Sequence, residues 1–272
     1  MNSVDEAKIG QKTKPRVLVV ANQKGGVGKT TTTVNLATAL VAIKKRVLVV
    51  DFDPQGNATT GLGFDRAQIK TSSYSVLIEG AGFESAVLAT DIPRLSIVPA
   101  SVHLAGAEVE LVNAERREYR LADAFETLGV GVFDYILIDS PPSLNLLTIN
   151  ALTAADAVLV PLQVEFYALE GLSHLLGTIE RVRRAFNPRL EIQGVVLTMF
   201  DQRNNLSEMV AEDVRNHLGD KVYSTIIPRN VRISEAPSFG KPVLLYDHSC
   251  AGSRAYIHLA GELLKRERAV SA

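Results

Sequence analysis

The sequence is poor in the residues that build disulfides and metal clusters. Its 272 residues include a single cysteine, Cys250, which allows no disulfide within the chain and no cysteine-based metal cluster. The five histidines show no spacing typical of metal ligands. Long apolar runs are missing too: runs such as residues 47–50 and 157–160 have the length of strands, and no stretch could cross a bilayer. We therefore expect an intracellular protein whose chemistry depends on other side chains.

The chain has almost no net charge, which at first argues against a nucleic-acid partner. The total is −1, but residues 1–180 hold 15 Lys/Arg against 20 Asp/Glu, whereas residues 181–272 hold 14 against 10. A basic C-terminal third could present a positive surface to a polyanion. From charge alone, ordinary scatter of surface residues explains the difference more simply.

Short apolar segments alternate with helical segments along most of the chain. Strands are predicted at residues 16–21, 46–51, 95–98, 135–139, 157–161 and 192–198. Helices are predicted at residues 29–43, 117–128, 146–154, 168–185, 206–218 and 256–265. This alternation indicates an α/β fold with a mostly parallel, twisted sheet and helices on both faces. No repeat or linker divides the chain, so we predict a flexible tail at residues 1–14 and one domain at residues 15–272.

A glycine-rich segment joins the first predicted strand to the first helix. Its sequence, Asn22-Gln23-Lys24-Gly25-Gly26-Val27-Gly28-Lys29-Thr30-Thr31, matches the phosphate loop G-x-x-x-x-G-K-[ST] except at Gln23, the first glycine position. Backbone N–H groups of such a loop surround the β-phosphate, and the helix N-terminus adds partial positive charge. We expect Lys29 to reach the β- and γ-phosphates of ATP, Thr30 to ligate Mg²⁺ and Thr31 to contact the α-phosphate. A turn without a ligand would leave Lys29 and Thr30 at the helix start unexplained.

Acidic residues end two of the predicted strands. Asp51 and Asp53 lie in Val50-Asp51-Phe52-Asp53-Pro54-Gln55-Gly56-Asn57-Ala58-Thr59, where strand alternation would point both carboxylates to one side. A turn rich in Asp, Pro and Gly is the alternative interpretation. Asp139 ends an apolar strand in Phe133-Asp134-Tyr135-Ile136-Leu137-Ile138-Asp139, the Walker B pattern. We expect Asp139 to reach Mg²⁺ through water, because Mg²⁺ usually keeps several waters.

The loop sequence Lys24-Gly25-Gly26-Val27-Gly28-Lys29-Thr30 resembles the deviant Walker A loop of the ParA/MinD group of ATPases. Further segments are similar to the chromosomal ParA/Soj branch of that group, and the resemblance runs from about residue 17 to residue 264. The segments that carry it are residues 61–63, 104–108, 147–152, 167–172, 227–232 and 234–242. The resemblance implies a P-loop ATPase for chromosome or plasmid partitioning, in the cytoplasm and on the nucleoid.

The resemblance also implies roles for particular residues. In an ATP-bound homodimer, Lys24 would cross the interface to the partner's ATP, and Gly25 would lie where the two loops face each other. Asp53 would position the attacking water, and Asp51 would hold the hydration shell of Mg²⁺. The adenine would lie near Met199, Pro228 and Asn230.

Two partners are implied as well: double-stranded DNA, bound without sequence preference, and a ParB-type protein that stimulates hydrolysis. The arginines of the family that bind DNA correspond to Arg203 and Arg232. A surface ion pair or a helix cap is the alternative role for each arginine. Weaker candidates for DNA contact are Lys241, Arg254, Lys265 and Arg266.

Three other proteins share the deviant loop. A MinD-like positioning ATPase would need an amphipathic membrane anchor, and residues 265–272 offer little apolar area for one, so no membrane partner is expected. A protein of the nitrogenase iron-protein type would need more cysteines than Cys250. A metabolic enzyme of the dethiobiotin-synthetase kind would need substrate-specific loops that the sequence does not display.

Overall fold

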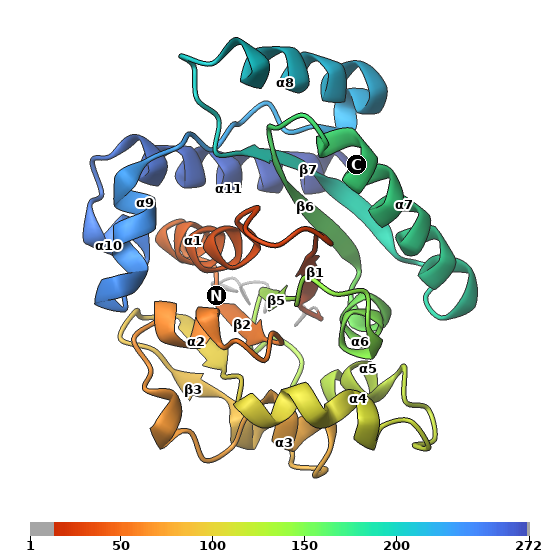
Figure 1. Cartoon of the computed structure of the whole chain (residues 1–272). Helices are drawn as coiled ribbons and strands as arrows, with labels where there is room; N and C mark the ends of the chain where they lie inside the picture. Colours follow the sequence, from red (N-terminus) through yellow and green to blue (C-terminus); the bar gives the residue numbers. More distant parts are fainter. Residues whose placement is uncertain (1–13, 271–272) are drawn as a thin grey trace, which may run out of the picture.

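A seven-stranded sheet runs through the centre of the molecule, with strand order β3-β4-β2-β5-β1-β6-β7 (Figure 1). The computed structural model describes residues 14–270, so the predicted tail lies outside the described residues apart from Lys14. The strands are β1 (Arg16–Val20), β2 (Val47–Asp51), β3 (Leu88–Ala89), β4 (Leu95–Val98), β5 (Tyr135–Asp139), β6 (Ala157–Gln163) and β7 (Glu191–Thr198). Every pair of neighbours is parallel except β3 and β4. The predicted α/β fold with a mostly parallel sheet is confirmed.

Helices cover both faces of this sheet (Figure 1). The longer helices are α1 (Lys29–Ala42), α6 (Leu146–Ala154), α7 (Ala168–Ala185), α8 (Asn205–Leu218) and α11 (Ala251–Val270). The shorter helices are α2 (Asn57–Gly61), α3 (Ser73–Leu77), α4 (Ala107–Glu110), α5 (Arg120–Phe125), α9 (Val231–Glu235) and α10 (Val243–Tyr246). Short 3₁₀ turns η1 (Arg66–Gln68), η2 (Phe83–Ala86), η3 (Val102–Gly106), η4 (Gly219–Lys221) and η5 (Ala236–Phe239) connect them.

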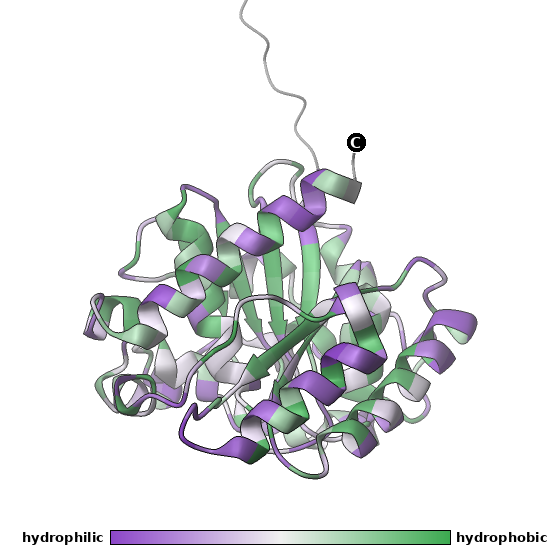
Figure 2. Cartoon of the chain, turned by 90° about the horizontal axis from the view of Figure 1, so that it is seen from above, coloured by the Kyte–Doolittle hydropathy of each residue, from purple (hydrophilic) through white to green (hydrophobic). Residues whose placement is uncertain are grey.

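Two hydrophobic clusters, one on each face, hold the layers together. Along β2, Leu48 and Val50 belong to the cluster under α6, α7 and α8, whereas Val47 and Val49 belong to the cluster under α1 and α11. Alternate side chains of a strand point to opposite faces, so a strand that is buried on both sides must be apolar throughout. Figure 2 shows this pattern, with hydrophobic strands inside and helices that carry a hydrophilic outer side.

The structure contains elements that the sequence did not predict, among them β3 and the short helices α2, α3, α4, α9 and α10, and it places several helix ends elsewhere than expected. α5 covers only Arg120–Phe125 of the expected 117–128, because Asn150 of α6 holds the preceding turn. Its amide Nδ2 donates to the Arg117 carbonyl over 2.7 Å, and its Oδ1 accepts the Leu121 N–H over 3.2 Å. α11 is longer than the expected 256–265 at both ends. Near its start, Gly252 lies so close to Ile233 that a Cβ would stand 2.5 Å from Ile233 Cγ1, so this glycine serves packing.

A candidate nucleotide site at the carboxyl edge of the sheet

The phosphate loop leaves β1, rises above the sheet edge and enters α1. Gly26 and Gly28 have φ angles of +76° and +90°, in the left-handed region that only glycine adopts without strain. A Cβ built on Gly25, Gly26 or Gly28 would meet no atom within 4 Å. The glycines therefore allow the backbone conformation of the loop and leave open space above it, as a loop that wraps a phosphate requires.

Hydrogen bonds from neighbouring strands fix the loop in place. The Asn22 amide Nδ2 donates to the Pro161 carbonyl of β6 over 2.8 Å, and Asn22 Oδ1 accepts the Lys24 N–H over 3.0 Å. At the other end of the loop, Thr198 Oγ1 of β7 donates to the Val27 carbonyl over 2.9 Å. The loop is thus shaped before any ligand binds.

Lys29 points into the loop that it terminates. The residue is only 7% exposed, and its Nζ donates to the Lys24 carbonyl over 3.0 Å. Burial lowers the pKa of the Lys29 ammonium, while the nearby charges of Asp139 and Asp53 oppose that shift. A buried ammonium with one backbone acceptor is a strong site for an anion, since a phosphate would replace the water that burial removes.

Asp51 and Asp139 lie side by side, because they are register partners at the ends of β2 and β5. Both are fully buried. The N–H and Oγ1 of Thr59 donate to Asp51 Oδ2 over 2.7 and 2.6 Å. Asp139 accepts from Thr30 Oγ1 over 2.7 Å and from Thr33 Oγ1 over 3.2 Å. The Walker B acid therefore contacts the threonine that is expected to ligate Mg²⁺.

Burial of these carboxylates is unfavourable in the absence of a cation. Burial raises the pKa of Asp51 to about 6, although the hydrogen bonds from Thr59 act to lower it. Burial, and then the charge of Asp51, raise the pKa of Asp139 well above its usual value. Asp53, which is 7% exposed, adds further negative charge near Asp139 and accepts the Gln55 N–H over 2.9 Å. The predicted metal and water-positioning residues are thus brought together in one acidic cluster.

The oxygen atoms of this cluster suit Mg²⁺ better than a metal ion whose ligands all come from the protein. Among residues 14–270, no three His, Cys, Asp or Glu side chains are arranged to hold a metal ion by themselves. Mg²⁺ is instead usually bound through one or two protein oxygens, several waters and the phosphates of a nucleotide. Thr30 Oγ1, with Asp139 and Asp51 behind it, supplies this kind of partial coordination shell.

A cavity of about 240 Å³ lies beside the phosphate loop. It is lined by Gly28 and Thr31 of the loop region, together with Met199, Pro228 and Asn230. The expected adenine residues therefore lie beside the loop, although they follow Gly28 by 171 to 202 residues in the chain. Asn230 has a structural task as well, because its Oδ1 accepts the Arg232 N–H over 2.9 Å and caps α9.

Lys24 lies on the open side of the loop. Its side chain is 50% exposed, and its ammonium forms an ion pair with Glu165, in the connection between β6 and α7. Glu165, Thr33 and Thr59 were not among the predicted site residues. The position of Glu165 just after a strand, at the edge where the loop lies, was the available signal for it.

The two arginines predicted for DNA contact lie at separate places. The Arg203 guanidinium pairs with Asp201 over 2.8 Å and holds the pKa of that carboxyl down at about 2. Arg232 pairs with Glu235 over 2.9 Å and with Asp247 over 3.4 Å. The alternative role of a surface ion pair is therefore present for both arginines, although the side chains remain 87% and 53% exposed.

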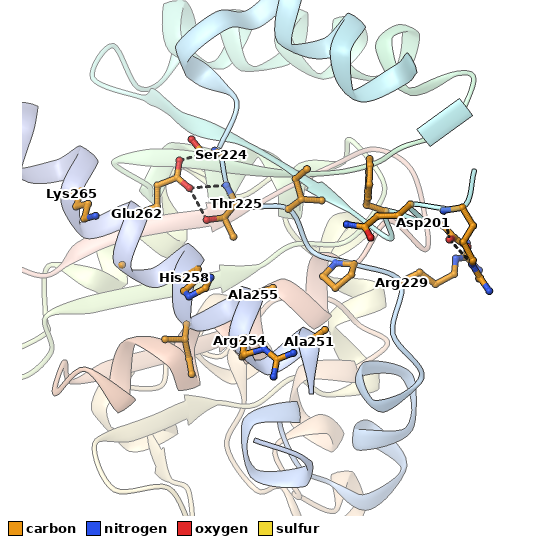
Figure 3. A pocket seen from close by; sticks show the side chains of 17 residues that line it. Asp201, Ser224, Thr225, Arg229, Ala251, Arg254, Ala255, His258, Glu262 and Lys265 are labelled. Atoms are coloured by element: carbon orange, nitrogen blue, oxygen red, sulfur yellow. Dashed lines mark hydrogen bonds and ion pairs between the residues drawn. The ribbon is translucent and has the colours of Figure 1, made fainter. Parts of the chain in front are cut away.

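Arg203 borders an open groove of about 1190 Å³ between α11, the loop that follows β7 and the segment at residues 224–229 (Figure 3). Four Lys/Arg side chains line this groove against two carboxylates: Arg203, Arg229, Arg254 and Lys265 against Asp201 and Glu262. Glu262 is engaged by the N–H groups of Ser224 and Thr225 over 2.8 and 2.9 Å. We call this surface the basic groove. Arg232 is not among the residues that line it.

Comparisons with known proteins support the same assignment. Residues 15–192 match the family model described as AAA domain. The chain is 63% identical to the chromosome partitioning protein ParA of Caulobacter vibrioides, over 93% of this chain and 95% of that protein. It is 53% identical to the sporulation initiation inhibitor protein Soj of Bacillus subtilis, over 91% of this chain and 98% of that protein.

Solved structures extend the likeness to the fold. A Mycobacterium smegmatis protein named cobyrinic acid a,c-diamide synthase, solved with ADP and magnesium, superposes with a TM-score of 0.83 at 39% identity. The superposition covers 93% of this chain and 96% of that protein. The resemblance found in the sequence is confirmed, and the chain belongs to the ParA/Soj family of chromosome-partitioning ATPases.

Proposed function

We propose that this chain is a nucleotide-operated switch for DNA partitioning. With ATP and Mg²⁺ bound, two copies pair through their phosphate loops and bind double-stranded DNA without sequence preference. Hydrolysis, stimulated by a ParB-type protein, separates the copies and releases the DNA. In the cell, the ATP form would be located on the nucleoid. The observation that carries the proposal is a second lysine, Lys24, on the open side of a loop whose inner position Lys29 already fills.

The residues around the loop divide the chemistry between them. Lys29 and the loop N–H groups hold the β- and γ-phosphates, and Thr30, Asp51 and Asp139 hold the metal with its waters. When bound, Mg²⁺ offsets the negative charge of the phosphates and of the acidic cluster. Asp53 orients the attacking water and accepts its proton, for which a carboxylate close to the γ-phosphate is suited. The adenine would occupy the cavity that Met199, Pro228 and Asn230 line.

Lys24 makes the switch depend on a second copy. In the single chain it is held by Glu165, and in the dimer it would exchange this exposed ion pair for the partner's phosphates. An exposed ion pair contributes about 0–1 kcal/mol, so the exchange costs little. A lysine offers one point charge where an arginine finger would offer a planar fork, and slow intrinsic hydrolysis follows from that.

The basic groove and Arg232 would provide the DNA surface. Each copy presents only a few cations, and several of them are already paired with carboxylates, so one copy should bind weakly. Two copies double the number of phosphate contacts, and affinity for DNA rises steeply with that number. This explains in physical terms why DNA binding should require ATP.

The direct test is DNA binding with ATP, ADP or no nucleotide. The wild type and Lys24→Ala are compared in fluorescence anisotropy with labelled duplexes of two unrelated sequences. We expect tight binding only for the wild type with ATP, equal for both duplexes. Lys70→Ala removes another exposed lysine and is the matched control. Unchanged ATP-dependent binding by Lys24→Ala would refute the proposed action of Lys24 on the partner's ATP.

The MinD-like alternative is tested in the same series. Among the described residues, no helix is long and apolar enough to cross a membrane. A MinD-like ATPase would instead associate with the membrane surface, so anionic phospholipid vesicles are added to the protein with ATP and sedimented. We expect the protein to remain in the supernatant with vesicles and to sediment with DNA-coated beads.

A further inference from the structure

Thr59 of α2 belongs to a ring of buried hydrogen bonds behind the acidic cluster. Its N–H and Oγ1 both donate to Asp51 Oδ2, over 2.7 and 2.6 Å. The same Oγ1 accepts the Ala100 N–H over 3.0 Å. Thr59 is fully buried, so these partners are not replaced by water. A hydroxyl can donate one hydrogen bond and accept others, and Thr59 uses its hydroxyl in both directions.

The ring closes through the start of α3. Ala100 follows Pro99, whose carbonyl accepts the Ser73 N–H over 2.8 Å. Ser73 Oγ in turn donates to the backbone carbonyl of Asp51 over 2.8 Å. Thr59 therefore holds Asp51 at its carboxylate and Ser73 holds it at its backbone, and the segment after β4 joins the two. Because each of these buried groups has its partner, the ring should be rigid.

The ring decides which carboxylate oxygen of Asp51 is available to a ligand. Oδ2 is occupied by the two donors of Thr59. Oδ1 faces the turn that carries Asp53, since it accepts the Asp53 N–H over 3.4 Å. This long hydrogen bond leaves Oδ1 with acceptor capacity, because a carboxylate oxygen can accept about two hydrogen bonds. Oδ1 is thus the oxygen that can receive a hydrogen bond from a water molecule around Mg²⁺.

We propose that Thr59 is a positioning residue for magnesium: its hydroxyl holds Asp51 Oδ2, so that Oδ1 is turned toward the water shell of the metal before the nucleotide binds. Without the hydroxyl, the carboxylate could rotate about its last bond, whose torsion is broad in carboxylates. Removal of such an outer contact typically weakens metal binding by about 10- to 100-fold. The role of Asp51 at the metal rests on the proposed function, whereas the ring of hydrogen bonds does not.

The test compares three variants at one position. Thr59→Ser keeps the hydroxyl, Thr59→Val removes it and keeps the shape, and Thr59→Ala removes the hydroxyl and the methyl group. The measured quantity is the Mg²⁺ concentration that gives half of the maximal tightening of a fluorescent ADP analogue, which we call the Mg²⁺ requirement. We expect it to rise about 10-fold in Thr59→Val and Thr59→Ala, and to stay within about 2-fold of the wild type in Thr59→Ser.

A purely structural role for Thr59 is the competing explanation, and Thr38→Val is its matched control. Thr38 is 4% exposed, and its Oγ1 donates to the Val34 carbonyl of the same helix over 2.9 Å. Loss of a buried hydroxyl lowers stability wherever it lies, so Thr38→Val should lower the Tm without raising the Mg²⁺ requirement. If Thr59→Val lowers the Tm and leaves the Mg²⁺ requirement unchanged, Thr59 serves stability alone and the proposal is wrong. If Thr59→Val does not fold, Thr59→Ala and Thr59→Ser carry the same comparison of the hydroxyl.

The action through Asp51 is tested by a double mutant. If Thr59 acts by orienting Asp51, its removal should have no further effect once the carboxylate is gone. We therefore expect Asp51→Ala to raise the Mg²⁺ requirement, and Asp51→Ala/Thr59→Val to match Asp51→Ala alone. Equal effects of Thr59→Val with and without the Asp51 carboxylate would show that Thr59 acts independently, which would overturn the proposal.

Failure of this proposal and failure of the proposed function give different results. If Asp51→Ala raises the Mg²⁺ requirement and Thr59→Val does not, Asp51 keeps its place at the metal and only the role of Thr59 is wrong. If Asp51→Ala leaves the Mg²⁺ requirement unchanged, the proposed place of Asp51 at the metal is wrong, and the role of Thr59 is wrong with it.

Discussion

The nucleotide site and the basic groove hold their charged residues in opposite ways. Asp51 and Asp139 are fully buried, and each accepts hydrogen bonds that fix its carboxylate. Arg203, by contrast, is 87% exposed and is held by one neighbouring carboxylate. The first arrangement fixes atoms in advance for one ligand, at the cost of burying charge. The second leaves flexible cations that can adjust to any stretch of a phosphate backbone.

This difference predicts unequal effects of mutation. A buried group that acts on one phosphate or one water has no substitute, so its removal should abolish nearly all of the activity. An exposed cation is one of several, so the effect of its removal should be partial and depend on salt concentration. The following changes test this comparison, from the largest expected effect to the smallest.

Lys29→Ala should have the largest effect. It removes a buried ammonium from the centre of the loop, and we expect hydrolysis to fall by at least about 100-fold together with ATP affinity. Hydrolysis is measured by phosphate release, and nucleotide binding by a fluorescent ATP analogue. Lys70→Ala is the control for removal of a lysine. Near-normal hydrolysis by Lys29→Ala would contradict the placement of the phosphates.

Asp53→Ala should separate ATP hydrolysis from ATP-dependent DNA binding. We propose that this carboxylate positions the attacking water, so its removal is expected to lower the hydrolysis rate by about 100- to 10,000-fold, while ATP-dependent DNA binding persists. Both quantities are measured on the same preparation. If DNA binding disappears as well, Asp53 serves the ATP-bound state rather than the chemical step.

Arg203→Ala and Arg254→Ala should each have a modest effect. Both residues line the basic groove, and a variant that binds one phosphate fewer should show a slope of log K against log salt that is shallower by about 0.9. ATP hydrolysis without DNA should be unchanged. The matched control is Arg94→Ala, since Arg94 lies outside that groove and donates to the Lys44 carbonyl. An unchanged slope for Arg203→Ala would mean that its pair with Asp201 is its whole role.

The pH dependence of stability should reveal the buried acids. A carboxyl whose pKa is raised in the folded state binds more protons when folded, so stability falls as pH rises through that range. For Asp51 the range runs from the ordinary value of 3.8 to about 6. The Tm without nucleotide should therefore drop between those pH values, and ATP with Mg²⁺ should raise the Tm more at pH 8 than at pH 5.5. Asp51→Asn should flatten both trends.

The sequence was sufficient to predict those parts of the site whose residues lie close together in the chain. The loop at residues 22–31 and the acids that end β2 and β5 could be predicted because each motif lies within a few residues, and parallel strands bring their carboxyl ends to one edge. The resemblance to the family suggested Met199 and Pro228 as adenine contacts, and both residues line a cavity with Gly28 and Thr31.

Contacts between distant segments could not be read in the same way. Glu165 lies 141 residues after Lys24, and neither segment contains a pattern that predicts the ion pair between them. Phe166, just before α7, and Met209 of α8 line one surface only because the fold brings these two segments together. The prediction of helix ends failed for the same reason. The start of α5 is set by hydrogen bonds from Asn150 of another helix, and not by the helix preference of its own sequence.

The central claim is that the γ-phosphate joins two copies of this chain. Light scattering after size-exclusion chromatography measures it most directly, with Asp53→Ala used so that ATP persists through the run. The account predicts a molar mass twice that of one chain with ATP and Mg²⁺, the mass of one chain with ADP, and the mass of one chain for Asp53→Ala/Lys24→Ala with ATP. The same mass in all three samples would contradict it.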